Sequence, residues 1–380
     1  MKILLLGSKE YPFGSSYKYD KKAGGGIEVH VEKLSKYLAR EGHEVFIITR
    51  KFPGQKKQET KKTGKSKIHV YRTKFMYNKF LRTFTFNALS SKEANRIIKE
   101  NKIDIIHCHG PVAGFFGSRL SKKTKIPMVF TTHGPGKIIG WNIVIRKILE
   151  RFVNTSYKSA KKIIFISKPA YDSDIKRNKE LKSKSALLTN AIDPDDFKIK
   201  TKRNWKEIRF LFLGRLEEIK GIKYLLQAFK KISDNVKDTK LYVAGEGSLK
   251  KYILDFIKKN DLKKRIKFLG WIEDTAKILS ETDVFVLPSW EKGQPIALLE
   301  AMASGKIIIT SLNYIEDGKT GIRIKPKNTQ DLYEKMMQVC NDLKKHNNLG
   351  KNAKMEIKEK MSWDTVIKKY IREYNSVIQS

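Results

Sequence analysis

The chain has 380 residues, of which 40% are hydrophobic and 31% are charged, a balance typical of a globular protein with room for two domains. No stretch approaches the roughly 18 consecutive apolar residues that span a bilayer, and the short apolar run after Lys2 predicts a buried strand rather than a secretion signal. The only cysteines, Cys108 and Cys340, cannot define a disulfide framework, so we expect a reducing, cytoplasmic location.

The formal net charge of +39 favours anionic partners, namely nucleic acid, anionic lipid or phosphorylated substrates. The lysines are spread along the chain instead of forming a tail, and aromatic residues do not alternate with basic ones in a recognition motif. No specific nucleic-acid site is therefore predicted, and a steeply salt-dependent affinity for DNA would be the test of that alternative.

In the first half of the chain, short apolar runs alternate with helical periods. Such runs are typical of strands buried on both faces of a parallel sheet. Strands are predicted at 2–8, 43–50, 68–74, 103–110, 127–134 and 161–167, with helices at 27–42, 93–102, 112–123 and 141–160. Residues 1–190 are thus predicted to form one doubly wound, Rossmann-like α/β domain.

The alternation breaks near residue 190 and then resumes. Residues 191–206 are polar and charged and contain a proline, so they are predicted to be a linker and a hinge. Further strands are predicted at 208–214, 239–247, 265–271, 283–289, 306–310 and 321–325, with helices at 222–232, 249–259, 275–282 and 295–305. Residues 207–362 are therefore a second predicted α/β domain. Ligands of such sheets collect beyond the carboxyl ends of the strands, which predicts a cleft between the two domains.

Two cations follow the first predicted strand of the second domain. In FLFLGRLEEIKGIKYLLQAF, Gly214 permits a tight turn before Arg215, and Lys220 precedes a helix whose free N–H groups carry roughly half a positive charge. A guanidinium, an ammonium and a helix N-terminus together suit a diphosphate, which they can neutralise without a metal ion. The alternative is two solvated basic residues.

Glu300 is surrounded by apolar residues in the segment PIALLEAMASGK. Burying an unpaired carboxylate is costly, so this side chain needs a partner. We expect Glu300 either to pair with a protein cation or to accept hydrogen bonds from a ligand, and its two oxygens suit vicinal hydroxyls such as those of ribose.

Three glycines precede the first amphipathic helix, in YDKKAGGGIEVHVEKL. Gly25 and Gly26 would let the backbone approach a phosphate or sugar at the helix N-terminus, although a merely flexible loop explains them nearly as well. The carboxylates at 172–174 and 193–196 are predicted to be solvated rather than to bind a metal.

Histidines also follow two predicted strands. His107 and His109 share one face of an extended segment while Cys108 points away, so a metal site is not predicted there. His133 lies at the tip of the next strand. It is either a ligand-binding residue or an edge histidine satisfied by protein groups.

These motifs, in this order, resemble the retaining glycosyltransferases of family 4, which have the two-domain GT-B fold. The resemblance covers nearly the whole chain and is carried by GGGIEVHVEKL, DIIHCHGPVAG, PMVFTTHG, LTNAID, LGRLEEIKG, VAGEG, PIALLEAMASGK and SWDTVIKKYIREY. It implies a hexosyl transfer from a nucleotide sugar, with retained anomeric configuration, no metal and no cofactor. It also implies that the last helix, at 363–380, crosses back to the N-terminal domain.

The resemblance further implies roles for individual residues. Arg215 and Lys220 would hold the diphosphate of the donor, Glu300 would hold its ribose, and His133 would lie beside the transferred sugar. The predicted donor site is completed by Gly25, Gly26, His109 and Glu291.

Two departures from the family pattern bear on activity. The family usually has two acidic residues eight positions apart, but counting back from Glu300 reaches Lys292, with Glu291 one residue further. The loop must shift to bring Glu291 in, or Lys292 alters donor preference, or activity is reduced. The loop at 311–315 is also shorter than usual, so part of the sugar-facing wall is absent.

The acceptor is predicted to be a hydroxyl on a glycan, a lipid-linked carrier or a small molecule, bound mainly by the N-terminal domain. The segment 141–162 mixes an apolar stripe with basic residues, so it either rests on an anionic surface at the inner face of the membrane or packs on the sheet. The alternatives to transfer are a nucleotide-sugar epimerase of the same architecture and a donor-binding protein with weak catalysis.

Overall fold

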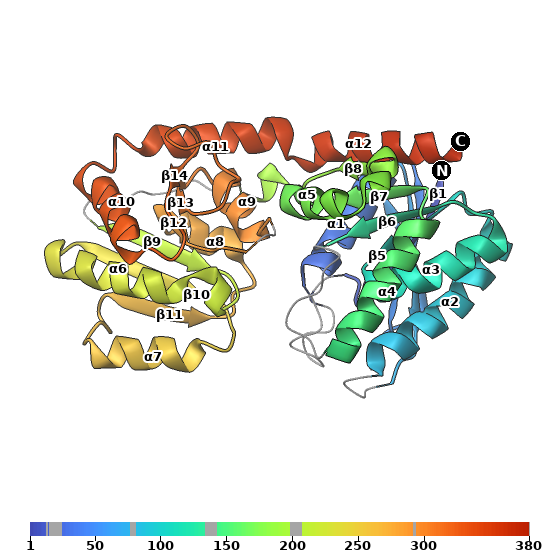
Figure 1. The fold of residues 1–380 in the computed structure, drawn as a ribbon, viewed down its shortest axis with the longest axis horizontal. Helices are drawn as coiled ribbons and strands as arrows, with labels where there is room; N and C mark the ends of the chain where they lie inside the picture. Colours follow the sequence, from blue (N-terminus) through green and yellow to red (C-terminus); the bar gives the residue numbers. More distant parts are fainter. Residues whose placement is uncertain are drawn as a thin grey trace. The chain divides into compact units, whose positions relative to one another are not determined.

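The structure is a computed structural model that describes residues 1–12, 14, 25–76, 81–133, 143–197, 207–291 and 294–379. The chain forms two compact units, each with its own sheet (Figure 1): unit 1 comprises Met1–Asn190 with Trp363–Ser380, and unit 2 comprises Ala191–Ser362. Within the described ranges, no helix has both the length and the apolarity needed to cross a bilayer.

Unit 1 contains an eight-stranded sheet in the order β3-β4-β2-β1-β5-β6-β7-β8. All neighbouring strands are parallel except β3 and β4. The strands are β1 (Lys2–Leu6), β2 (Glu44–Arg50), β3 (Gln58–Thr63), β4 (Ser66–Thr73), β5 (Ile105–His109), β6 (Met128–Thr132), β7 (Lys162–Phe165) and β8 (Ser185–Leu187). The predicted parallel sheet is confirmed. Strand β3 was not predicted, because QETKKT is an exposed edge strand with no apolar side chain.

The helices of unit 1 cover both faces of this sheet. They are α1 (Gly26–Arg40), α2 (Arg82–Asn101), α3 (Pro111–Thr124), α4 (Ile143–Ser159), α5 (Lys168–Arg177) and α12 (Trp363–Ile378). Side chains alternate along β5, so Cys108 joins the apolar core beneath α2, α3 and α4, whereas the His107 imidazole contacts Tyr374 of α12. The last helix therefore belongs to unit 1, as the family resemblance implies.

Glycines let α3 approach the sheet closely. A Cβ atom at Gly117 would lie 2.2 Å from Cys108 Sγ, well inside contact distance. Any other residue there would force the helix away from β5, so this glycine sets the spacing between the helix and the carboxyl end of the strand.

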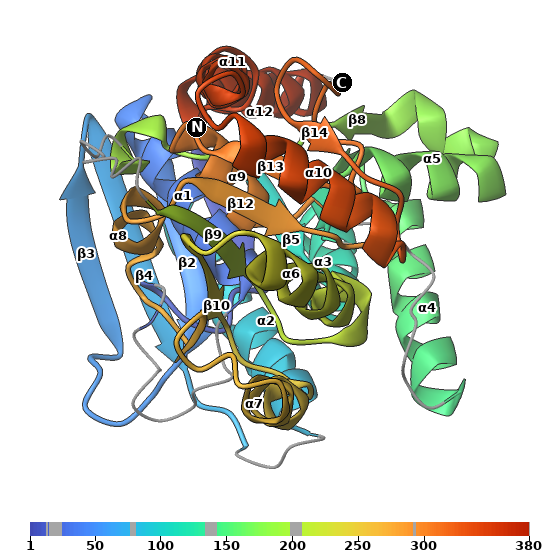
Figure 2. The ribbon, with the colours of Figure 1, turned by 90° about the vertical axis from the view of Figure 1, so that its left-hand side faces the viewer.

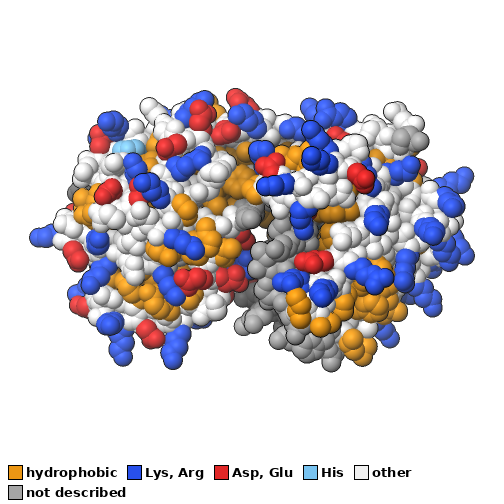
Figure 3. Space-filling model, viewed as in Figure 1, with side chains coloured by type: hydrophobic (Ala, Val, Ile, Leu, Met, Phe, Trp, Pro, Cys, Tyr) orange, Lys and Arg blue, Asp and Glu red, His pale blue; other side chains and the backbone are white. Residues whose placement is uncertain are grey.

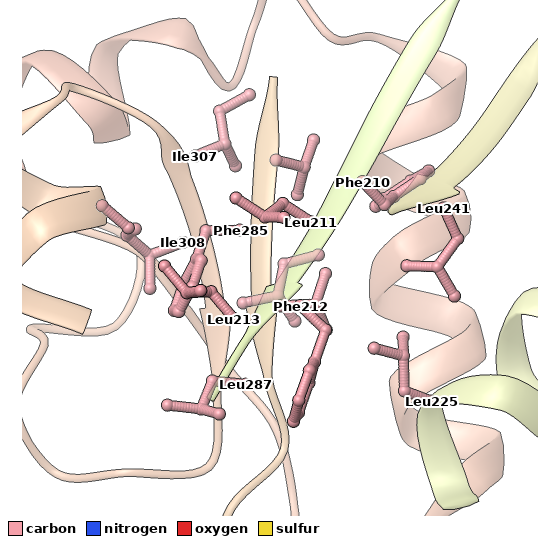
Figure 4. Close-up of a cluster of buried hydrophobic side chains, with 14 of the residues drawn as sticks. Phe210, Leu211, Phe212, Leu213, Leu225, Leu241, Phe285, Leu287, Ile307 and Ile308 are labelled. Atoms are coloured by element: carbon pink, nitrogen blue, oxygen red, sulfur yellow. The ribbon is translucent and has the colours of Figure 1, made fainter. Parts of the chain in front are cut away.

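Unit 2 contains a six-stranded parallel sheet in the order β11-β10-β9-β12-β13-β14. Its strands are β9 (Ile208–Leu213), β10 (Thr239–Ala244), β11 (Ile266–Gly270), β12 (Val284–Leu287), β13 (Ile307–Thr310) and β14 (Ile322–Arg323). Figure 4 shows how the central strands are buried: Phe210 and Phe212 of β9 lie on the side of the sheet that faces Leu225, while Phe285 of β12 lies beside β9. Burial on both faces makes β12 and the last four residues of β9 wholly apolar, while polar residues such as Arg209 and Thr239 lie near the starts of β9 and β10.

The helices of unit 2 are α6 (Ile222–Asn235), α7 (Lys250–Lys259), α8 (Thr275–Ser280), α9 (Ile296–Ala303), α10 (Thr329–Asn341) and α11 (Asn347–Lys360). Helices α6 and α10 pack side by side, as Figures 1 and 2 both show. Most of these helices coincide with the predicted helical periods.

Two expectations from the sequence need correction. Residues 191–197 are not a free linker, because Ile192 and Phe197 are buried in the core of unit 2; the rest of the predicted linker, 198–206, lies outside the described residues. Asp174 is not solvated either. It is buried at 1% exposure, accepts a hydrogen bond from the Tyr157 hydroxyl at 2.7 Å and pairs with Arg177, because α5 turns this side chain toward α4.

Candidate active site

Arg215 and Lys220 lie beyond the carboxyl end of β9, where the sequence predicted an anion site. A 3₁₀ turn, Glu218–Lys220, brings Lys220 to the start of α6, and Gly221 caps that helix with φ of +75°. A Cβ atom at Gly221 would lie 2.1 Å from the Pro288 carbonyl oxygen. Only glycine lets this turn approach the end of β12, which is the neighbour of β9 in the sheet.

The loop after β12 is tied to the same turn by hydrogen bonds. The backbone N–H of Trp290 and the hydroxyl of Ser289 both donate to the Ile219 carbonyl oxygen, at 3.1 and 3.0 Å. The N–H of Glu291 donates to the Ser289 hydroxyl oxygen at 3.2 Å. These bonds hold Glu291 next to Lys220, 71 residues earlier in the chain.

The Glu291 carboxylate is shared by both predicted cations. The Lys220 ammonium donates to Oε2, and the Arg215 guanidinium lies 3.4 Å from Oε1. Lys220 is buried, with 8% of its side chain exposed, whereas Arg215 is 60% exposed and also pairs with Glu217 at 2.9 Å. The two cations therefore converge on one anionic group. Glu291 is within reach of this site, while Lys292 lies outside the described residues.

Glu300 projects from α9, a helix whose other side chains are largely apolar and buried. The pKa of Glu300 is raised to about 7, mainly by burial; a hydrogen bond with Thr275 opposes this shift and the charge of Asp196 adds to it. Within the part of unit 2 that the structure describes, no lysine or arginine forms an ion pair with this carboxyl group. The Thr275 hydrogen bond is the protein contact of this carboxyl group that the structure shows, and a ribose hydroxyl remains a predicted partner.

Unit 1 carries a largely buried cluster of imidazoles beyond the carboxyl ends of β5 and β6. His109 ends β5, His133 follows β6, and His30 reaches them from α1. The His30 ring centroid lies 5.7 Å from that of His109 and 5.2 Å from that of His133. The sequence analysis missed His30, although its position one turn after the glycine loop, in IEVHVEKL, would place it near the same edge.

Two of the buried imidazoles are satisfied by the protein. His107 is hydrogen bonded to the hydroxyls of Tyr374 and Thr131, both at 2.7 Å. His30 contacts the Tyr370 hydroxyl at 3.1 Å and is hydrogen bonded to Asn190. Burial lowers the pKa of His30 to about 4 and that of His107 to about 3, so both rings are neutral near pH 7 and complete the packing of α12.

His109 and His133 differ, because they hydrogen bond to each other and leave one nitrogen without a partner. The distance from His109 Nδ1 to His133 Nε2 is 3.1 Å, and His109 Nε2 is buried with no partner among the described residues. Burial, with the neighbouring imidazoles, lowers the pKa of both residues well below its ordinary value.

Because His109 Nε2 has no hydrogen-bond partner among the described residues, one tautomer is favoured for each ring. A buried N–H group without an acceptor is rarer than an unused lone pair, so the proton of His109 belongs on Nδ1, from which it is donated to His133 Nε2. His133 then carries its own proton on Nδ1. In this arrangement His133 offers a neutral N–H donor rather than a charged acid.

The glycine loop is described only at its end. Gly25 caps α1 in an extended conformation, and its carbonyl oxygen accepts the N–H groups of Glu28 and Val29 at 3.1 and 3.2 Å. Gly26 begins the helix, and Gly24 lies outside the described residues. Glu28 is buried and accepts the backbone N–H of Lys9 at 3.2 Å, an interaction that the sequence analysis did not foresee.

In the described ranges, no three His, Cys, Asp or Glu side chains converge in a way that could hold a metal ion. The imidazole cluster is therefore organised by hydrogen bonds and packing.

Comparisons with known proteins cover both units. Residues 24–196 match the model of Glycosyltransferase Family 4, and residues 193–356 match that of Glycosyl transferases group 1. An uncharacterized glycosyltransferase of Methanocaldococcus jannaschii is 28% identical over 388 residues, covering 96% of this chain and 97% of the relative. The N,N'-diacetylbacillosaminyl-diphospho-undecaprenol alpha-1,3-N-acetylgalactosaminyltransferase of Campylobacter jejuni is 25% identical, covering 75% of this chain and 80% of its own.

Solved structures share the fold at lower identity. Sucrose-phosphate synthase from Thermosynechococcus elongatus superposes with a TM-score of 0.83 at 18% identity, covering 100% of this chain and 99% of that one. HepE from Anabaena in complex with UDP-glucose superposes with a TM-score of 0.75 at 17% identity, covering 99% of this chain and 100% of that one.

Proposed function

We propose that this chain, which belongs to the group 1 and family 4 glycosyltransferases and has their GT-B fold, transfers a sugar from a nucleoside diphosphate to a hydroxyl group with retained anomeric configuration. The observation that carries the proposal is the convergence of Arg215 and Lys220 on one carboxylate. Two fixed cations that already hold an anionic group are suited to the diphosphate of a leaving nucleotide.

The chemistry centres on charge separation at the donor. As the bond between the anomeric carbon and the phosphate oxygen breaks, negative charge grows on the diphosphate, and cations that are already in position stabilise it without reorganising. The buried Lys220 supplies a point charge at low dielectric, and Arg215 supplies a planar fork. The acceptor oxygen bonds to the anomeric carbon on the face that the diphosphate leaves, and its proton passes to a phosphate oxygen. Two protein cations can neutralise the diphosphate, so this route needs no metal ion.

The remaining predicted residues would orient the donor. The carboxylate of Glu300 would accept hydrogen bonds from the ribose hydroxyls. These hydroxyls would take the place of a lysine or arginine partner, which the described part of unit 2 does not provide. His133 would donate from Nδ1 to a sugar hydroxyl, and His109 would keep it in that tautomer. Gly25 and Gly26 remain a predicted point of approach to the donor.

The identity of the substrates follows from the relatives only as a proposal. HepE is solved with UDP-glucose, so UDP and its sugars are the first donors to test. The Campylobacter jejuni relative is named for an undecaprenyl-linked acceptor, which supports a lipid-linked or glycan hydroxyl as acceptor. A thermal-shift screen against UDP, GDP, ADP and CMP and their sugars would identify the donor, because a ligand at about 100 times its Kd stabilises by about 2.7 kcal/mol.

Arg215→Ala tests the proposed function. We expect the transfer rate to fall roughly 10²- to 10³-fold, as is typical when one electrostatic stabiliser is lost. Lys223→Ala is the control, since Lys223 is the second residue of α6 and contacts Glu218 and the Tyr252 ring rather than Glu291. A loss of less than about tenfold for Arg215→Ala would contradict the mechanism. NMR of the product would show retention or inversion at the anomeric carbon.

One observation favours a second candidate, a donor-binding protein with weak catalysis. The Glu291 carboxylate contacts both Arg215 and Lys220, the cations proposed to bind the diphosphate, so it competes with the donor for them. Turnover with a labelled donor separates the candidates: transferred sugar supports the transferase, an epimer of the donor supports an epimerase, and tight binding without either supports the binding protein.

A further inference from the structure

The exposed large apolar side chains of this protein are concentrated on two helices of unit 1. Phe84 of α2 is 48% exposed and Val144 of α4 is 61% exposed. The others in this group are Leu81, Leu89, Ile143 and Ile148. Figure 3 shows hydrophobic side chains gathered over the lower ends of α2 and α4, with Lys and Arg side chains around them. Contiguous exposed apolar patches of this kind usually mark an interaction site.

Aromatic rings connect the two helices across α3. The ring centroids of Phe84 and Phe116 are 5.3 Å apart, those of Phe116 and Phe115 are 5.5 Å apart, and those of Phe115 and Phe152 are 4.2 Å apart. Because α3 packs against both α2 and α4, these rings form one strip from helix to helix. The exposed apolar side chains at its two ends therefore belong to a single surface, which we name the α2–α4 surface.

The same surface is basic. On the exposed face of α4, Lys147 and Arg151 lie next to Ile148, and the Arg119 guanidinium of α3 lies 4.5 Å from the centre of the Phe115 ring. Helix α3 contains no acidic residue, α4 contains only Glu150, and the two glutamates of α2, Glu93 and Glu100, both pair with Arg96. Apolar and cationic side chains are thus interspersed, with little negative charge to oppose an anionic partner.

We propose that the α2–α4 surface docks the protein on a bilayer that contains anionic lipids. The apolar side chains would enter the boundary between headgroups and acyl chains, while Lys147, Arg151 and Arg119 would meet lipid phosphates. A protein partner fits less well, because the centres of protein interfaces are depleted in lysine, and here lysine lies within the apolar patch. The inference goes beyond sugar transfer and does not depend on the donor site.

Sedimentation with sucrose-loaded vesicles tests this proposal with the full-length protein. We expect the protein to bind vesicles of phosphatidylcholine mixed with phosphatidylglycerol, and to bind phosphatidylcholine alone much more weakly. Two double variants probe the two components of the surface: Phe84→Ser with Ile148→Ser, and Lys147→Glu with Arg151→Glu. Each should weaken binding roughly tenfold or more.

Matched controls come from unit 2. Leu254→Ser with Met355→Ser removes apolar side chains that are 44% and 55% exposed, and Lys258→Glu with Lys259→Glu reverses two exposed charges on α7. Both controls should bind within about twofold of the unsubstituted protein. Circular dichroism checks that each variant folds, and the charge variant changes only exposed side chains.

Three results would overturn the proposal. The first is no binding to the anionic vesicles. The second is equal weakening by the α7 charge variant, which would assign the binding to the net charge of +39 rather than to this surface. The third is a dimer in light scattering that the Phe84 and Ile148 variant dissociates, which would make a second copy of the chain the occupant.

Discussion

Glu300→Gln should stabilise the ligand-free protein at alkaline pH. Burial raises the pKa of Glu300 from its ordinary value of 4.5 to about 7. As pH rises, the unfolded chain loses this proton first, so ionisation favours unfolding and the free energy of unfolding falls through the window from 4.5 to 7. At about 1.4 kcal/mol for each pKa unit, the loss is about 3 kcal/mol by pH 8.

Glutamine keeps the shape of the side chain and removes the charge. The variant should therefore match the unsubstituted protein near pH 4.5 and exceed it by up to about 3 kcal/mol at pH 8, or by roughly 6 to 12 °C in Tm for a unit of this size. Thermal unfolding followed by circular dichroism at pH 5 and pH 8 measures the difference. Glu334→Gln on α10, an exposed position, is the control and should show no such gain.

The same thermal unfolding measurement, repeated in the presence of UDP, tests whether Glu300 contributes to UDP binding. Glutamine would still accept one hydrogen bond from a ribose hydroxyl but would lose the charge-assisted pair, so UDP should raise the Tm of the variant less than that of the unsubstituted protein. If Glu300→Gln proved less stable at pH 8, the carboxylate would be stabilised by a protein group beyond its hydrogen bond with Thr275, which would refute the proposal that a ligand is its main partner.

Two further substitutions test the cations and the imidazoles. Glu291→Gln removes the carboxylate that competes for Lys220, so calorimetry should show UDP binding roughly tenfold tighter; unchanged binding would mean that Glu291 does not compete with UDP, and weaker binding would mean that it helps to hold UDP. His109→Ala removes the donor to His133, so we expect kcat to fall about tenfold while UDP affinity stays the same. His109→Asn, whose amide can donate from the Nδ1 position, should recover part of that loss, and no recovery would favour a purely structural role for His109.

Much of the fold could be predicted because its strands are buried on both faces. Their apolar runs predicted two parallel sheets, although not the order of the strands within them, and β3 was missed because an edge strand of polar residues has no such pattern. The first half of α2 was also not predicted to be helical. Its sequence, RTFTFNALSS, is rich in threonine and phenylalanine, which are weaker helix formers, so packing rather than propensity makes it helical.

The candidate site could be predicted only in part. The positions of Arg215 and Lys220 follow from a strand end and a helix start, which are local features of the sequence. Their contact with Glu291 depends on hydrogen bonds between two loops that lie far apart in the chain, so spacing alone could not reveal it. The contacts of His30 could not be predicted for the same reason, since its partners come from β5, from the residue after β6 and from α12.

The place of α12 in unit 1 has a consequence for biosynthesis. Unit 1 needs Tyr370 and Tyr374 to close the face of its sheet over His30 and His107, yet all of unit 2 is translated before these tyrosines. Nascent chains usually mature in order from the amino terminus. Here we expect unit 2 to reach its native state before unit 1, because unit 1 cannot complete its fold until α12 has been translated.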